Sequence, residues 1–200
     1  DLTIAAVNGN VVTVEEPLTA RHVAADTDFE SAFGEVRTLQ QRAEVGLLTR
    51  NIIIRGNVHE EWAELIPECE KGIAVGLSEV QTCFQGQFGE EMGSDQFGGA
   101  VMLNKPEYGK VEYAEFTHMG QAFALGRYSM HFHMSGDQPE SYFRGNAIHH
   151  TFNRALTIHG TNELLVEKNV AYNVMGLTYF IEDAIEQNNI IQYNLAVFTR

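Results

Sequence analysis

The sequence predicts an all-β chain wound as a parallel β-helix, and three observations support this fold. Asparagines open three successive units in the last third of the chain, at positions 146, 169 and 194. Their starts are 23 and 25 residues apart (169 − 146 and 194 − 169), a period typical of solenoids. Short β-rich runs fill each unit, and none of them has a long helical period. These observations indicate coils stacked one strand spacing apart, at roughly 4.8 Å.

The rest of the chain extends this pattern toward the N-terminus. Asparagines at matching positions suit stacked coils, because each amide can bond to the coils above and below it. Three strand-like runs upstream read as earlier coils: NIIIRG (51–56), GAVMLN (99–104) and KVEYAEFTH (110–118). We therefore predict one domain, with β-helix coils over residues 51–200 and entry or capping strands over residues 1–50.

Shorter signals predict the remaining local structure. LTIAAVNGNVVTVEEPL (2–18) alternates along its length and contains an Asn-Gly pair, which predicts a hairpin. HEEWAELIPECEKG (59–72) could form a short helix, and the glycine-rich stretch 86–99 is expected to be a loop.

The balance of charge excludes some classes of partner. Thirteen lysines and arginines against 27 aspartates and glutamates give a formal net charge of −14. This charge repels phosphate backbones, so we expect no nucleic-acid partner. Polyanionic glycans would need a local basic groove or bridging cations. No window approaches the roughly 18 apolar residues of a membrane span, so no direct membrane insertion is expected.

The chain has two cysteines, Cys69 and Cys83. Their separation of fourteen residues (83 − 69) allows them to form a disulfide. Two reduced and buried thiols are an equal alternative, and one pair of cysteines does not decide the redox compartment.

The stretch GRYSMHFHMSGD (126–137) has the strongest chemical signal. Strict alternation predicts that Tyr128, Met130, Phe132 and Met134 face the core. Arg127, Ser129, His131 and His133 then face outward, where a groove along the solenoid could present the two histidines. An outward histidine on a solenoid is as often a plain polar surface residue.

Later coils continue this pattern. The predicted alignment places the inward residues Met130, Ile158 and Ile181 at matching positions. His131, His159 and Glu182 then form one outward column, in which neighbours lie close enough to share a proton or hold a metal ion. These three residues are the candidate acid and base groups. Arg127, His133 and Asp137 are candidate substrate contacts, and His131, His133 and His159 are candidate ligands of a divalent metal, the one cofactor that we consider.

Several long stretches, in order, also resemble a known family: RAEVGLLTRNIIIRG (42–56), VQTCFQGQFGEEMGSDQFGG (80–99), GQAFALGRYSMHFHMSGD (120–137), YFRGNAIHHTFNRALTIHG (142–160) and residues 169–200. The chain resembles the fibrocystin-L-like proteins and, more distantly, fibrocystin and the cell-surface and migration-inducing hyaluronidases. The resemblance implies a right-handed parallel β-helix similar to pectate lyases, which follows a G8 domain. It also implies an extracellular, cell-surface or ciliary location within a longer protein.

The resemblance implies different functions for its two branches. The hyaluronidase branch degrades an extracellular glycan, whereas the fibrocystin-L-like branch has no established reaction. This chain departs from the family pattern at Leu177, Ala184 and Ser129, where relatives often have histidine or glycine, glycine and proline. The change at Leu177 removes one candidate groove ligand.

Two functions therefore remain open. The first is a non-enzymatic scaffold and ligand-binding segment, whose partners are other segments of the same long chain, other copies, or protein or glycan ligands. The second is a carbohydrate-active β-helix in which His131, His159 and Glu182 act on a glycan. A third role for the same residues is a metal site that only stabilises the fold.

Overall fold

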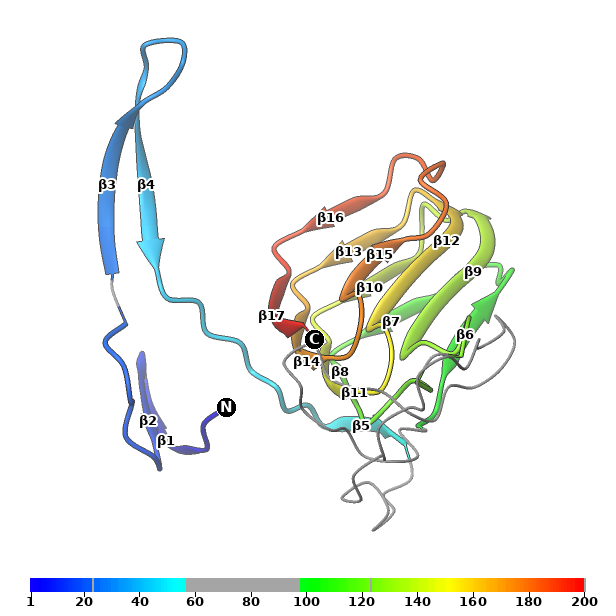
Figure 1. Ribbon diagram of the computed structural model, residues 1–200, viewed down its shortest axis with the longest axis horizontal. Coiled ribbons are helices and arrows are strands. Elements are labelled where there is room, and N and C mark those ends of the chain that lie inside the picture. Colours follow the sequence, from blue (N-terminus) through cyan, green and yellow to red (C-terminus); the bar gives the residue numbers. More distant parts are fainter. Residues whose placement is uncertain (23, 57–97, 123, 200) are drawn as a thin grey trace, which may run out of the picture. The chain divides into compact units, whose positions relative to one another are not determined.

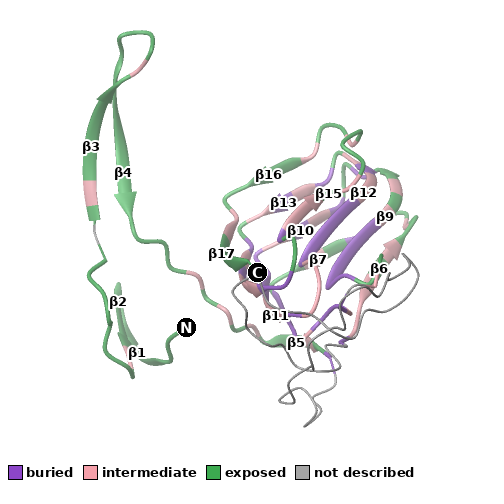
Figure 2. Cartoon of the chain, in the orientation of Figure 1, coloured by how far each residue is buried: buried purple, intermediate pink, exposed green. Residues whose placement is uncertain are grey.

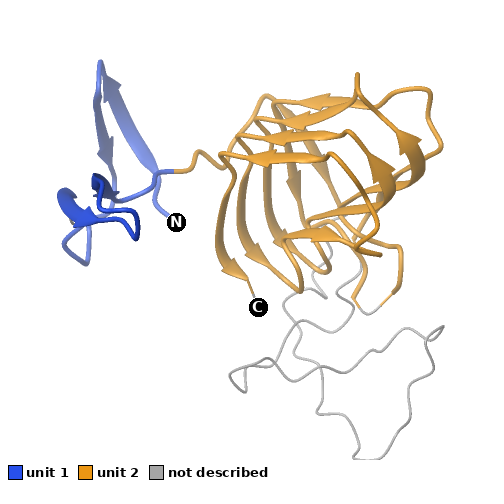
Figure 3. Ribbon diagram, turned by 90° about the horizontal axis from the view of Figure 1, so that it is seen from above, with its two compact units in different colours: residues 1–45 blue, residues 46–200 orange. Residues whose placement is uncertain are grey.

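The computed structural model describes residues 1–22, 24–56, 98–122 and 124–199. The chain divides into two compact units, Asp1–Val45 and Gly46–Arg200 (Figure 3). The helix expected over 59–72, both cysteines and most of the loop expected over 86–99 lie outside the described residues.

The first unit consists of two antiparallel hairpins. In the first, β1 (Ile4–Asn8) pairs with β2 (Val11–Val14), and Gly9 in the turn has a φ of +58°, which glycine adopts without strain. This confirms the hairpin predicted from the Asn-Gly pair. In the second, β3 (Ala24–Glu30) pairs with β4 (Val36–Arg42). That residues 1–50 cap the coils remains a prediction.

The second unit is a parallel β-helix of three sheets (Figure 1). One sheet contains β5 (Ile52–Arg55), β8 (Ala114–Thr117), β11 (Ala147–Thr151), β14 (Val170–Val174) and β17 (Leu195–Thr199). The next contains β6 (Val101–Asn104), β9 (Met130–Asp137), β12 (Leu156–Asn162) and β15 (Tyr179–Ile181). The last contains β7 (Lys110–Glu112), β10 (Tyr142–Arg144), β13 (Leu165–Glu167) and β16 (Ile190–Gln192). All neighbouring strands in these sheets pair in parallel, which confirms the predicted fold.

The core lies between the three sheets, where apolar side chains from successive coils stack. Buried residues concentrate on the central strands, from β8 to β14 (Figure 2). Met130 and Phe132 of β9 and Leu156 and Ile158 of β12 are almost fully buried, as alternation predicts. Met134 is an exception, because its φ of +50° turns the strand and leaves its side chain exposed. Among the described residues, no helix is long and apolar enough to cross a membrane.

One corner of the β-helix repeats in three successive described coils and explains the asparagine period. A residue with positive φ makes the turn, as Gly145, Lys168 and Tyr193 do in successive coils. The next residue is Asn146, Asn169 or Asn194, and we call these three the asparagine ladder. The Asn169 Oδ1 atom accepts hydrogen bonds from the backbone N–H (2.9 Å) and the Nδ2 (3.1 Å) of Asn146. Asn194 repeats both contacts to Asn169, so the predicted amide stacking is confirmed.

The predicted alignment of the histidine strands is wrong in one of its two steps. Ile158 does pair with Ile181, but Met130 pairs with Leu156 rather than with Ile158. Leu156 and Ile158 both face the core, so a shift of two residues leaves the alternation unchanged and the pattern cannot detect it. The structure therefore aligns His133, not His131, with His159.

Candidate functional site

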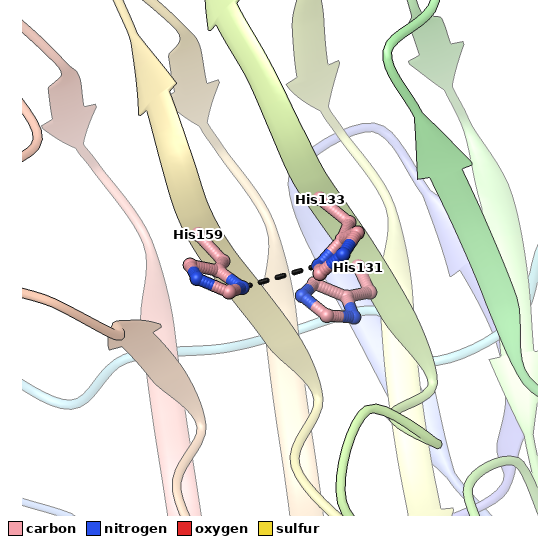
Figure 4. A group of neighbouring side chains, drawn as sticks. All are labelled: His131, His133 and His159. Atoms are coloured by element: carbon pink, nitrogen blue, oxygen red, sulfur yellow. Dashed lines mark hydrogen bonds between the residues drawn. The ribbon is translucent and has the colours of Figure 1, made fainter.

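Three histidines, which we call the histidine cluster, meet on the sheet formed by β6, β9, β12 and β15. His131 and His133 lie on β9, and His159 lies beside His133 on β12 (Figure 4). One ring nitrogen from each histidine lies within 4.8 Å of the other two. The structure thus brings together the three histidines that the sequence analysis named as candidate metal ligands, although it pairs His133 rather than His131 with His159. Their role stays a prediction.

His131 is not presented in an open groove, contrary to the prediction from alternation. Its side chain is only 3% exposed, because the ring of Tyr128 lies 4.9 Å from its own ring between centroids and the Gly126 carbonyl contacts it. Its Nδ1 lies 3.3 Å from the carbonyl oxygen of Gly126, which can only accept, so Nδ1 carries the hydrogen. Burial lowers the pKa of His131 to about 4, so the ring is neutral at neutral pH.

The other two histidines contact each other. The Nδ1 atoms of His133 and His159 lie 3.1 Å apart, which is a hydrogen bond if one donates and the other accepts (Figure 4). On the far side of its ring, the Nε2 of His159 lies 3.0 Å from Oδ2 of Asp183. That carboxylate favours a hydrogen on Nε2 and directs the lone pair of Nδ1 toward His133.

Glu182 follows β15 and reaches the same cluster. Its Oε2 lies 3.8 Å from Nε2 of His131 and 3.8 Å from Nδ1 of His159. Its Oε1 lies 3.4 Å from the hydroxyl of Tyr128 and 3.6 Å from Nη1 of Arg154. The prediction that Glu182 joins two histidines therefore agrees with the geometry, although the role of these residues stays a prediction.

Arg154 holds this carboxylate in place. Its guanidinium lies 4.6 Å from the ring centroid of Tyr128 and 4.0 Å from that of Phe180, and Nη1 donates to the Tyr128 hydroxyl at 2.9 Å. Sequence reasoning missed Arg154, because it lies in the connection before β12, where no strand period applies. It also missed the Tyr128 hydroxyl, since alternation predicted only a core side chain.

Two buried polar atoms, one in the histidine cluster and one on the neighbouring Glu182, have no hydrogen-bond partner among the described residues. They are Nε2 of His131 and Oε2 of Glu182, which face each other. An unpaired polar atom that is buried costs free energy, on the order of 1–3 kcal/mol. Their position suggests that the site binds something further, and nitrogen and carboxylate donors are suited to a metal ion or to a proton shared between groups.

The other candidate residues lie apart from the cluster's contacts. Arg127 is exposed. Asp137, at the far end of β9, accepts a hydrogen bond from Asn162 at 2.9 Å. Leu177 is 45% exposed. The disulfide proposed for Cys69 and Cys83 stays a prediction, because both lie outside the described residues.

A second, simpler histidine contact lies on the sheet of β8 and β11. Nε2 of His149 lies 3.3 Å from Oε1 of Glu115, and both side chains are largely buried. Burial lowers the pKa of His149 although Glu115 opposes this shift. His149 pairs with Tyr172 of the next coil.

The fold and the histidine cluster together define a class of protein: a parallel β-helix in which histidine and other polar side chains gather on one of the three sheets. The model of the CEMIP beta-helix family matches residues 96–200. The chain belongs to this family.

Curated relatives agree with this assignment. Fibrocystin-L of Mus musculus is 49% identical over 207 residues, which cover 99% of this chain and 5% of that protein, and fibrocystin-L of Homo sapiens is also 49% identical. The cell surface hyaluronidase CEMIP2 of Homo sapiens is 34% identical over 170 residues, which cover 81% of this chain and 11% of that protein. The resemblance seen in the sequence is confirmed. No solved structure matches the chain.

Proposed function

We propose that this chain is a non-enzymatic β-helix segment of a large cell-surface protein, where it serves as a scaffold and as a binding surface. The observation that supports this most is its identity of 49% with fibrocystin-L along the whole chain, which spans 5% of that protein's length. A segment of this size within so long a protein suits a structural unit that positions its neighbours. A relative is named a cell surface protein, which favours an extracellular location.

The geometry of the cluster favours binding over glycan cleavage. Glycosidases place two carboxylates on opposite sides of the scissile bond, typically about 5 to 10 Å apart. Here Glu182 and Asp183 are adjacent in the chain and both contact the same ring, that of His159. His131 is too deeply buried to reach a polymer. The net charge of −14 also opposes the approach of a polyanionic glycan.

The partners that we propose are other coils of the same protein or a second copy. Strands β15, β16 and β17 each lie at the edge of their sheet among the described strands. Edge strands offer unpaired backbone groups, and Tyr193 and Phe198 near this edge are exposed. A stable, strictly monomeric 200-residue chain in sedimentation velocity would contradict this part of the proposal.

The second candidate is a carbohydrate-active β-helix, favoured by the 34% identity with a protein named as a hyaluronidase. It would use His131, His159 and Glu182 as acid and base groups. Incubation of the chain with high-molecular-mass hyaluronan, sized on agarose gels, separates the two candidates.

The scaffold proposal expects no shortening of the polymer. Shortening that disappears in His159→Ala, but persists in the control His149→Ala, would overturn it in favour of the second candidate.

A further inference from the structure

We propose that His131, His133, His159 and Glu182 bind one divalent transition-metal ion, and that Zn²⁺ is the ion expected. This site goes beyond the scaffold function proposed above and does not depend on it. Four side chains from three neighbouring coils would then be joined through one ion.

The spacing of the ring nitrogens suits such an ion. The Nδ1 atoms of His133 and His159 lie 3.1 Å apart, and all three histidines offer a nitrogen within 4.8 Å of the others. Zinc bonds of about 2.1 Å in a tetrahedral site separate ligand atoms by about 3.4 Å. Small rotations of the side chains therefore suffice to bring the three nitrogens to one ion.

Hydrogen bonds on the far side of two rings prepare the correct nitrogen for the metal. Nδ1 of His131 is held by the Gly126 carbonyl, which leaves Nε2 as the atom with the lone pair. Nε2 of His159 is held by Asp183, which leaves Nδ1. Histidines that ligate metals usually donate their second N–H to a carbonyl or a carboxylate in this way. Both kinds of partner are present here.

Glu182 supplies the fourth ligand atom and the charge. Its Oε2 lies 3.8 Å from the lone-pair nitrogens of both His131 and His159, and it has no hydrogen-bond partner among the described residues. Arg154 and Tyr128 contact the other oxygen and keep the carboxylate in this position. A metal ion would satisfy both unpaired buried atoms, Nε2 of His131 and Oε2 of Glu182, in one step.

The donor set selects the class of metal. Three imidazole nitrogens and one carboxylate oxygen suit zinc and its neighbours among the transition metals. Calcium and magnesium prefer sites made only of oxygen atoms. The alternative without metal is a proton shared between His133 and His159, which the 3.1 Å contact also allows.

The experiment uses the complete 200-residue chain, stripped with a chelator and titrated with Zn²⁺ by calorimetry, with bound metal counted by mass spectrometry. We expect one zinc per chain, and a loss of affinity of at least a hundredfold in His133→Ala and in His159→Ala. The matched control is His149→Ala, a histidine on another sheet of the same coils, which should bind zinc as the unmodified chain does. Circular dichroism verifies that each variant is folded.

A further variant, at Asp183, tests the hydrogen bonds that orient the metal ligands. Asp183→Asn should keep one zinc per chain but bind it about ten to a hundred times more weakly, because His159 loses the carboxylate that orients it. Cobalt should give the visible absorption of a tetrahedral site in the unmodified chain. The proposal is overturned if the unmodified chain binds no zinc, or if His133→Ala and His159→Ala bind it as tightly as the control.

Discussion

Two groups of polar side chains that stack between coils, the asparagine ladder and the histidine cluster, were unequally visible in the sequence. The asparagine ladder repeats with one residue type and spacings of 23 and 25 residues, and the structure confirms it at every step. The histidine cluster and the neighbouring Glu182 combine two residue types, and the step from His133 to His159 is 26 residues. The comparison shows that a polar contact that stabilises the corner recurs from coil to coil, whereas a site that belongs to one part of the surface does not recur.

The cause lies in the connections between strands. At the asparagine corner only two residues separate β10 from β11, and two again separate β13 from β14. The connection after β9 covers residues 138–141, but the one after β12 covers only 163–164, and the pairing of β9 with β12 contains a register shift of one residue. Because the corner has a constant length, it preserves the spacing of the asparagines. The other connections vary in length, so the histidine strands are displaced relative to the asparagine corner.

The largest effect is expected at the asparagine ladder. Asn169→Ala removes hydrogen bonds to Asn146, Asn194 and the Phe143 carbonyl in a buried position. Several buried groups then lose their partners, so we expect a loss of about 3 kcal/mol or more in the free energy of unfolding, measured in urea.

Gln192→Ala is the matched control for this change. The Gln192 amide also bridges two coils, to Glu167 at 2.9 Å, but it does so at the surface. Its loss should cost less than about 0.5 kcal/mol. Equal effects of the two variants would contradict a special role of the buried ladder.

A smaller effect is expected from pH at the histidine cluster in the chelator-treated chain. The pKa of His131 is lowered by burial from 6.5 to about 4, so the folded state resists protonation more than the unfolded state. The contribution of the neutral His131 ring to the free energy of unfolding is complete above pH 6.5. It is lost as the pH falls toward 4, by about 3 kcal/mol at most.

Urea unfolding between pH 4 and pH 7.5 measures this contribution. His131→Gln should flatten the dependence on pH in that window, whereas His22→Gln, at an exposed histidine of the first unit, should leave it unchanged. The same slope in His131→Gln and in the unmodified chain would show that burial of this ring is not the cause.

The smallest effect is expected beside the cluster, at Ala184. This residue has a φ of +57°, which costs an L-residue about 1–2 kcal/mol, although glycine loses more entropy on folding. Ala184→Gly should therefore stabilise the chain by less than about 1 kcal/mol, seen as a slightly higher Tm. A lower Tm would indicate that the alanine methyl group makes a contact worth more than the strain.

The sequence predicted the fold well, because a β-helix repeats its own constraints in each coil. The asparagine period, the N-terminal hairpin and the inward residues of β9 and β12, except Met134, were predicted correctly from local patterns. The members of the histidine cluster were also selected, since alternation places them on one face.

Other features of the site could not be predicted. A shift of two residues between strands preserves alternation, so the partner of His131 was assigned wrongly. The burial of His131 depends on Gly126 and Tyr128, and the position of Glu182 depends on Arg154. These contacts join irregular connections to strands, and no periodic pattern encodes them.

The tight corner after β10 and β13 also limits how this fold can change during evolution. Each corner is occupied by one residue with positive φ and one asparagine, so an inserted residue would break the ladder of two coils at once. Insertions and deletions among homologous chains should therefore gather at the other two corners, as between β8 and β9. A protein engineer who wishes to graft a new loop onto this β-helix should choose the same places.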